Sequence, residues 1–151
     1  MRKLILTLLT AMLCVSLIGC TKRFTLDLPF DAADITNVEM YLYSDPDSAE
    51  KRTMMDKEDI RELYNYFSNL DVQSKEIKRV SGGKILSFRF HLSDGTDYEI
   101  IYYAQAVKSG SLSIPSEQLN YFTSADVGAL WTQYQQYPTV SVNKSELPGV
   151  E

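Results

Sequence analysis

Cysteine, histidine and tryptophan are scarce in this chain of 151 residues, which contains two cysteines, one histidine and one tryptophan. A structural zinc site needs several Cys or His ligands, so the composition excludes one. Both cysteines, Cys14 and Cys20, lie within the first twenty residues. The remainder of the chain therefore has no thiol for a disulfide, a thiolate metal site or a cysteine nucleophile.

Positive charge is also in short supply, because 15 Lys and Arg residues face 20 Asp and Glu residues, for a net charge of −5. An acidic chain is a poor partner for nucleic acid, whose phosphates attract basic proteins. We expect neither a nucleic-acid partner nor a bound cofactor.

Only one long apolar run is present, at the start of the chain. Arg2 and Lys3 precede the apolar segment from Leu4 to Ile18. This length suits a secretory signal and is short for a membrane span, which needs ~20 residues. An A-x-A-like cleavage site, the usual end of such a signal, is missing.

The sequence Leu17-Ile18-Gly19-Cys20 resembles the lipobox of bacterial lipoproteins. The resemblance implies that residues 1–19 are a signal peptide, cut before Cys20, and that the Cys20 sulfur carries a diacylglycerol. Two or three acyl chains hold a protein stably on a membrane. The expected location is the outer face of the bacterial cytoplasmic membrane. The alternative is an uncleaved membrane helix with an incidental cysteine.

Removal of residues 1–19 leaves 132 residues and, with Arg2 and Lys3 gone, changes the net charge from −5 to −7. This length suits a single domain. We expect a lipidated Cys20 with a tether over residues 20–34, one domain over residues 35–142, and a flexible tail over residues 143–151. Thr21 to Asp34 would reach about 45 Å if fully extended.

Hydrophobic periodicity predicts the first elements of the domain. A strand is expected over residues 35–43, with Val38, Met40 and Leu42 on one side, and a weaker strand over residues 51–55. Asp56 is placed to cap a helix. Apolar residues at helical spacing form its buried stripe: Ile60, Leu63, Tyr64, Phe67 and Leu70.

A hairpin is predicted around Ser93-Asp94-Gly95, with Gly95 in a left-handed bulge position. A three-residue loop pairs Phe90 with Tyr98, whereas a two-residue turn would set Phe90 against Glu99. The three-residue loop also places opposite charges in register, His91 against Asp97 and Arg89 against Glu99.

The remaining elements are shorter. Strands are expected over residues 76–80, 104–107 and 112–114, and an edge strand over residues 139–142. A last helix, capped by Thr123 or Ser124, has a stripe of Val127, Leu130, Trp131 and Tyr134. The predicted fold class is α+β: an antiparallel sheet of four to six strands with two helices packed on one face.

Two candidate sites for chemistry are weak. His91 has a carboxylate neighbour in Asp97, as a general base would need, but a solvated cross-strand pair explains it more simply. Asp45 to Glu50 offers carboxylates for a loop-bound calcium ion, yet it departs from the EF-hand pattern.

Tyrosine is the better functional hint, with ten residues in the chain. Tyr41, Tyr43, Tyr66 and Tyr103 fall opposite the predicted core positions. Tyrosine is common on half-exposed sheets, and clustered exposed tyrosine also suits binding of proteins or glycans. The predicted binding face comprises Tyr41, Tyr43, Arg89, His91 and Tyr103.

The lipobox, the short tether and the strand–DKEDIRELYNYF–hairpin order make the chain similar to small lipoproteins of Gram-positive, clostridia-like bacteria. This resemblance contains no catalytic motif. The leading hypothesis is a lipid-anchored, non-enzymatic binding or accessory module whose partner is an envelope protein or a glycan. The alternatives are a small envelope hydrolase or lyase using His91, and a subunit of a transporter or sensor complex.

Overall fold

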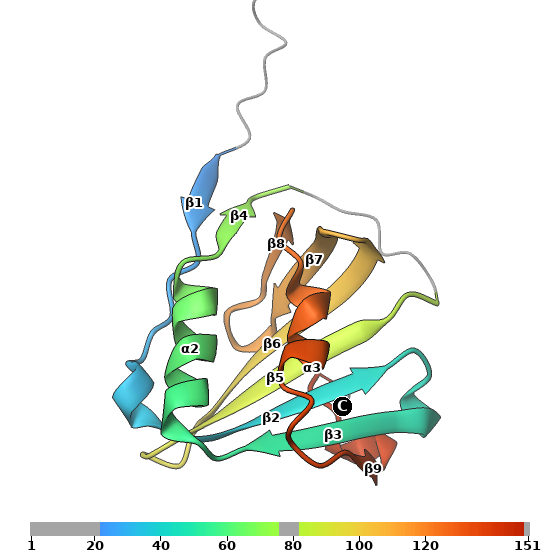
Figure 1. The fold of residues 1–151 in the computed structure, drawn as a ribbon. Helices are drawn as coiled ribbons and strands as arrows, with labels where there is room; N and C mark the ends of the chain where they lie inside the picture. Colours follow the sequence, from blue (N-terminus) through green and yellow to red (C-terminus); the bar gives the residue numbers. More distant parts are fainter. Residues whose placement is uncertain (1–21, 76–81, 150–151) are drawn as a thin grey trace, which may run out of the picture.

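The computed structural model describes residues 22–75 and 82–149, which form a single antiparallel sheet with two helices on one face (Figure 1). The strand order is β1-β4-β8-β7-β6-β5-β2-β3-β9. The strands are β1 (Arg23–Thr25), β2 (Ile35–Tyr43), β3 (Ala49–Met54), β4 (Asp71–Gln73), β5 (Ile85–Leu92), β6 (Asp97–Ala106), β7 (Ser109–Ile114), β8 (Leu119–Thr123) and β9 (Val140–Val142). The helices are α2 (Lys57–Ser68) and α3 (Leu130–Gln133), with 3-10 turns η1 (Ala32–Asp34), η2 (Pro46–Ser48), η3 (Pro115–Glu117), η4 (Val127–Ala129) and η5 (Lys144–Glu146).

The predicted fold class is wrong, because the described sheet has nine strands rather than four to six and strand dominates the fold. Three of the strands, β1, β4 and β8, have no counterpart in the prediction. Each is only three to five residues long, too short for a clear period-two pattern. They extend the sheet beyond β7. The strand predicted over residues 76–80 lies outside the described residues.

The central hairpin of β5 and β6 forms in the predicted register. Phe90 pairs with Tyr98, Arg89 with Glu99 and His91 with Asp97. Gly95 has a φ of 87°, the left-handed conformation that the three-residue loop requires. The prediction is confirmed here because the apolar pattern, the charges and the turn chemistry all favour one register.

Helix α2 is also confirmed, since the carboxylate of Asp56 accepts hydrogen bonds from the backbone N–H groups of Glu58 and Asp59. Its buried residues, Ile60, Leu63 and Phe67, pack against the sheet. The last helix is shorter than predicted, a 3-10 turn followed by four helical residues, although Val127, Leu130 and Tyr134 are buried as expected.

Both helices cover the same side of the sheet, which we call the helix face. Its core contains Val38 and Met40 of β2, Phe88 and Phe90 of β5, and Ile100 of β6, all with 0% exposure. We call the opposite side the second face.

The expected tether is part of the fold. Leu26 and Leu28 are buried in the helix-face core, and the hydroxyl of Tyr64 donates a hydrogen bond to the backbone oxygen of Phe30. Residues 26, 28 and 30 alternate with Asp27 and Pro29, a period-two pattern that buries one side of an extended segment. From Arg23 onward, this stretch is packed rather than a free spacer.

Candidate functional site

The structure brings the predicted binding-face residues together on the second face. Tyr41, Arg89 and His91 occupy alternate positions on β2 and β5, opposite the apolar residues of the helix face. Tyr43 and Tyr103 lie in one cross-strand row, because each pairs with Ile85. The predicted grouping is therefore present, but its surroundings differ from the expectation of an exposed surface.

Tyr41 and Tyr43 are buried, with 0% and 6% exposure, so the prediction that they lie on an exposed face is wrong. They form a small second cluster with Ala49 and Leu147. Leu147 follows η5 in the segment expected to be a flexible tail, and it is 2% exposed. This C-terminal cover, residues 143–149, closes that part of the second face.

A network of charged side chains continues the second face from Tyr41. Glu39 lies at its centre: its carboxylate accepts hydrogen bonds from the Tyr41 hydroxyl at 2.5 Å and from Lys51 Nζ at 2.8 Å. Arg89 Nε lies 2.8 Å from Glu99 Oε1, and Arg89 Nη1 donates to the Tyr41 hydroxyl at 2.9 Å. The charges of four neighbouring strands, β6, β5, β2 and β3, are thus paired with one another.

The C-terminal cover is joined to this network. Glu146 Oε2 lies 3.6 Å from Lys51 Nζ, and the backbone N–H of Gly149 donates to Glu99 Oε2 at 3.2 Å. Burial tends to raise the pKa of Glu39, but hydrogen bonds from Lys51, Tyr41 and His91 outweigh it and lower the pKa to about 2. Glu39 is therefore held ionised as the anchor of the network.

His91 lies between two carboxylates. Its Nδ1 is 2.7 Å from Asp97 Oδ1 and its Nε2 is 3.2 Å from Glu39 Oε2. Both ring nitrogens are thus engaged by carboxylates of the chain itself, and this geometry disfavours His91 as a general base.

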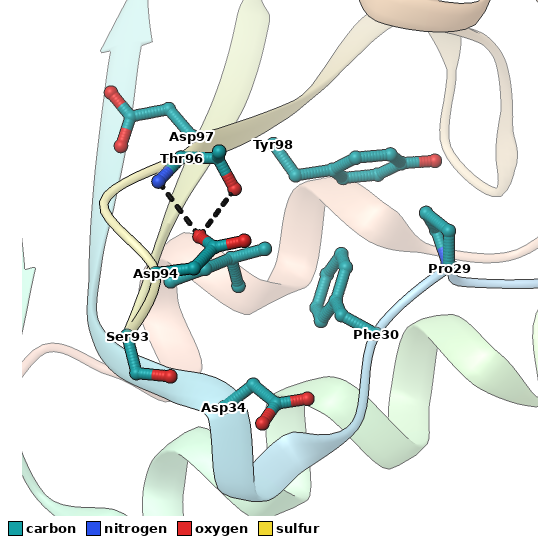
Figure 2. Close-up of a pocket in the computed structure, with 9 residues that line it drawn as sticks. Pro29, Phe30, Asp34, Ser93, Asp94, Thr96, Asp97 and Tyr98 are labelled. Atoms are coloured by element: carbon teal, nitrogen blue, oxygen red, sulfur yellow. Dashed lines mark hydrogen bonds between the residues drawn. The ribbon is translucent and has the colours of Figure 1, made fainter.

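A pocket of about 410 Å³ opens beside Asp97, at the tip of the β5–β6 hairpin (Figure 2). We call it the hairpin pocket. It lies between the hairpin and the segment that leads into η1. Its lining residues are Pro29, Phe30, Asp34, Leu92, Ser93, Asp94, Thr96, Asp97 and Tyr98.

Aromatic rings form one wall of the hairpin pocket. The rings of Phe30 and Tyr98 meet edge to face with centroids 5.1 Å apart, and Phe30 also contacts Phe90 of the core at 5.7 Å. The hydroxyl of Tyr98 donates to Glu117 at 2.6 Å. Burial and this hydrogen bond raise the pKa of Tyr98 well above its usual range, so the ring remains a neutral, fixed surface.

Two carboxylates, Asp34 and Asp94, give the hairpin pocket its charge, whereas the carboxylate of Asp97 is directed at His91. Asp94 accepts hydrogen bonds from the hydroxyl of Thr96 at 2.7 Å and from its backbone N–H at 2.8 Å, as Figure 2 shows. These two bonds lower the pKa of Asp94. No lysine or arginine is among the lining residues, so the pocket favours a positively charged group.

The pocket and the charged network are connected through one residue. Asp97 lines the hairpin pocket and also contacts His91. The predictions found Asp97 as a cross-strand partner but missed Phe30, Asp34 and Tyr98 as pocket residues. No local pattern reveals this pocket, because its two walls lie about sixty positions apart in the sequence.

The remaining predicted sites, the lipidation site and the calcium-binding loop, add no further candidate. Cys20 and the lipobox lie outside the described residues. Asp45 caps η2 by accepting a hydrogen bond from the backbone N–H of Asp47. Across residues 22–75 and 82–149, no group of three His, Cys, Asp or Glu side chains is arranged to hold a metal ion. Within the same ranges, no helix combines the length and apolarity needed to cross a membrane.

No family model, curated protein or solved structure matches this chain in the comparisons with known proteins.

Proposed function

We propose that the protein is a lipid-anchored, extracytoplasmic binding module that takes an ammonium or guanidinium group in the hairpin pocket. The lipobox supports the anchor at Cys20 and a location on the outer face of the cytoplasmic membrane. One observation carries the binding role: the pocket presents the carboxylates of Asp34 and Asp94 and an aromatic wall, and its lining residues include no lysine or arginine. Carboxylates and ring faces both attract organic cations.

The partner that suits this chemistry best is a basic segment of an envelope protein. A lysine or arginine side chain is long enough to place its charge beside Asp34 and Asp94 while its methylene groups contact the ring of Phe30. Membership of a transporter or sensor complex is compatible with this proposal. The hydrolase alternative based on His91 is weaker, because both of its ring nitrogens already face carboxylates.

Binding is tested with the full, lipidated protein in detergent micelles and two probes, tetramethylammonium and an acetylated, amidated Gly-Arg-Gly peptide. NMR shifts are followed at the backbone amides of Gly95 and Thr96, at the hairpin tip. We expect both probes to shift these amides, with weaker binding as salt is added. A response to the peptide alone assigns the site to a protein segment, and a response to tetramethylammonium alone assigns it to a small amine.

The double variant Asp34→Asn, Asp94→Asn keeps acceptor oxygens and removes two charges. We expect it to weaken binding about tenfold or more, in line with the usual contribution of charge-assisted hydrogen bonds. The control is Asp47→Asn, which removes an exposed charge outside the pocket. Unchanged amide shifts with both probes, or equal loss of binding in the control, would rule out the hairpin pocket as the site.

A further inference from the structure

The position of β1 constrains how the domain sits on a membrane, on the premise that Cys20 carries lipid as proposed above. β1 begins at Arg23, three positions after Cys20. Three extended residues span at most about 11 Å. The expected tether of about 45 Å is thereby reduced to a quarter, because residues 23–34 belong to the fold.

This short connection leaves little room between the domain and the bilayer. The headgroup layer of one leaflet is about 5 to 8 Å thick, as the difference between total and hydrocarbon thickness gives. Acyl chains on Cys20 must lie below that layer. Arg23 is then within a few ångströms of the headgroup surface, so the end of the sheet containing β1 has to contact it.

The side chains at this end suit such a contact. Phe24 is 39% exposed, and its ring meets the ring of Tyr121 edge to face at 5.2 Å. Lys75 lies over the ring of Phe122 at 5.5 Å from its centroid. Aromatic residues beside basic ones are typical of the interface between water and lipid.

The charged side chains at this end of the sheet also suit contact with a membrane. Lys22, Arg23 and Lys75 are exposed at the start of β1 and just beyond the end of β4, where Arg23 pairs with Gln73. The nearest acidic residue of β4, Asp71, pairs with Thr25 at the other end of β1. Each basic residue close to an anionic surface contributes about 1 kcal/mol of attraction, whereas the acidic remainder of the domain is repelled.

We propose that the β1–β4–β8 end of the sheet rests on the lipid headgroups, with Phe24 and the basic residues Lys22, Arg23 and Lys75 in contact. The occupant of this surface is the outer leaflet of the membrane that holds Cys20. β9, at the opposite end of the strand order, is then distal. Figure 1 shows β1 and β4 at one end of the molecule and β9 and the β5–β6 hairpin toward the other, so the hairpin pocket faces away from the membrane.

The absence of cysteine after Cys20 makes a labelling test clean. Ser74→Cys places a fluorophore between Gln73 and Lys75, and Ser141→Cys places the same fluorophore on β9. Both serines are exposed, and the substitution changes one atom. Eight strand spacings separate β1 from β9, up to about 38 Å.

Each labelled, lipidated protein is reconstituted into vesicles of equal parts phosphatidylglycerol and phosphatidylcholine with a nitroxide on a fraction of the headgroups. We expect strong loss of fluorescence at position 74 and little at position 141. Equal loss at both positions, or greater loss at 141, overturns the orientation. Mass spectrometry of the same samples separates the two proposals: diacylglyceryl-Cys20 with equal quenching defeats only the orientation, and an unmodified Cys20 defeats the anchor and the orientation together.

Discussion

The two faces of the sheet are built from the same strands and are held in different ways. On the helix face, Phe67 of α2 meets Phe88 of β5 at 4.8 Å in an apolar core that continues under both helices. On the second face, the segment 143–149 covers two tyrosines and joins a network of paired charges. Strand alternation therefore determines which residues lie on each face. The segment that covers a face determines how that face responds to substitution and to pH.

The helix face should be the more sensitive to loss of a single side chain. Phe88→Ala removes a ring with 0% exposure, and we expect about 4 kcal/mol of destabilisation from lost burial and the cavity left behind. Urea unfolding followed by circular dichroism measures it. Val107→Ala, at a residue with 84% exposure, is the control and should change stability by less than about 0.5 kcal/mol. A loss below about 1 kcal/mol for Phe88→Ala would contradict a rigid core on this face.

The second face should instead be sensitive to acid. Folded Glu39 has a pKa of about 2 against an ordinary value of 4.5, so its stabilising effect is complete above pH 4.5 and is lost as the pH falls toward 2. We expect the free energy of unfolding to fall by up to about 3 kcal/mol between pH 5 and pH 2 from this residue.

Urea titrations at several pH values between 6 and 2 measure this dependence. Glu39→Gln should flatten the profile over that range, whereas Glu50→Gln, at an exposed position of the neighbouring strand β3, should leave it unchanged. If Glu39→Gln retains the slope of the unmodified protein, the charged network does not stabilise the second face.

Substitution in the C-terminal cover should give the smallest loss of stability of the three. Leu147→Ala removes one buried side chain from a short surface segment, and we expect about 2 kcal/mol of destabilisation, the lower end for such a change. Tyr41 and Tyr43 should also become accessible to acetylation by N-acetylimidazole, detected by mass spectrometry. Ser145→Ala, an exposed residue of the same segment, is the matched control. Continued protection of both tyrosines in Leu147→Ala would show that the cover does not shield them.

The sequence was sufficient where the interacting residues are close together in the chain. The β5–β6 register follows from residues 85–103, and the cap of α2 from Asp56 and its next three residues. Both rest on local periodicity and turn chemistry, which a single sequence contains.

The rest depends on contacts between distant segments. Phe24 pairs with Val72 and Gln73 with Phe122, and three-residue strands carry no period that would announce such pairings. Tyr41 and Tyr43 were expected to be exposed because nothing near them in sequence indicates a cover. The alternation of Leu26, Leu28 and Phe30 was the one available signal that the expected tether is packed.

Because the chain is synthesised from its N-terminus, a residue and the distant segment that covers it are made at different times. Leu147 comes 104 positions after Tyr43, the residue it covers. Ribosomes add about 5 to 20 residues per second, so the two tyrosines wait roughly 5 to 20 seconds for their cover to be synthesised. β5 and β6 are made within that interval, so the second face that they form with β2 is complete before its cover and is until then open to association with other chains.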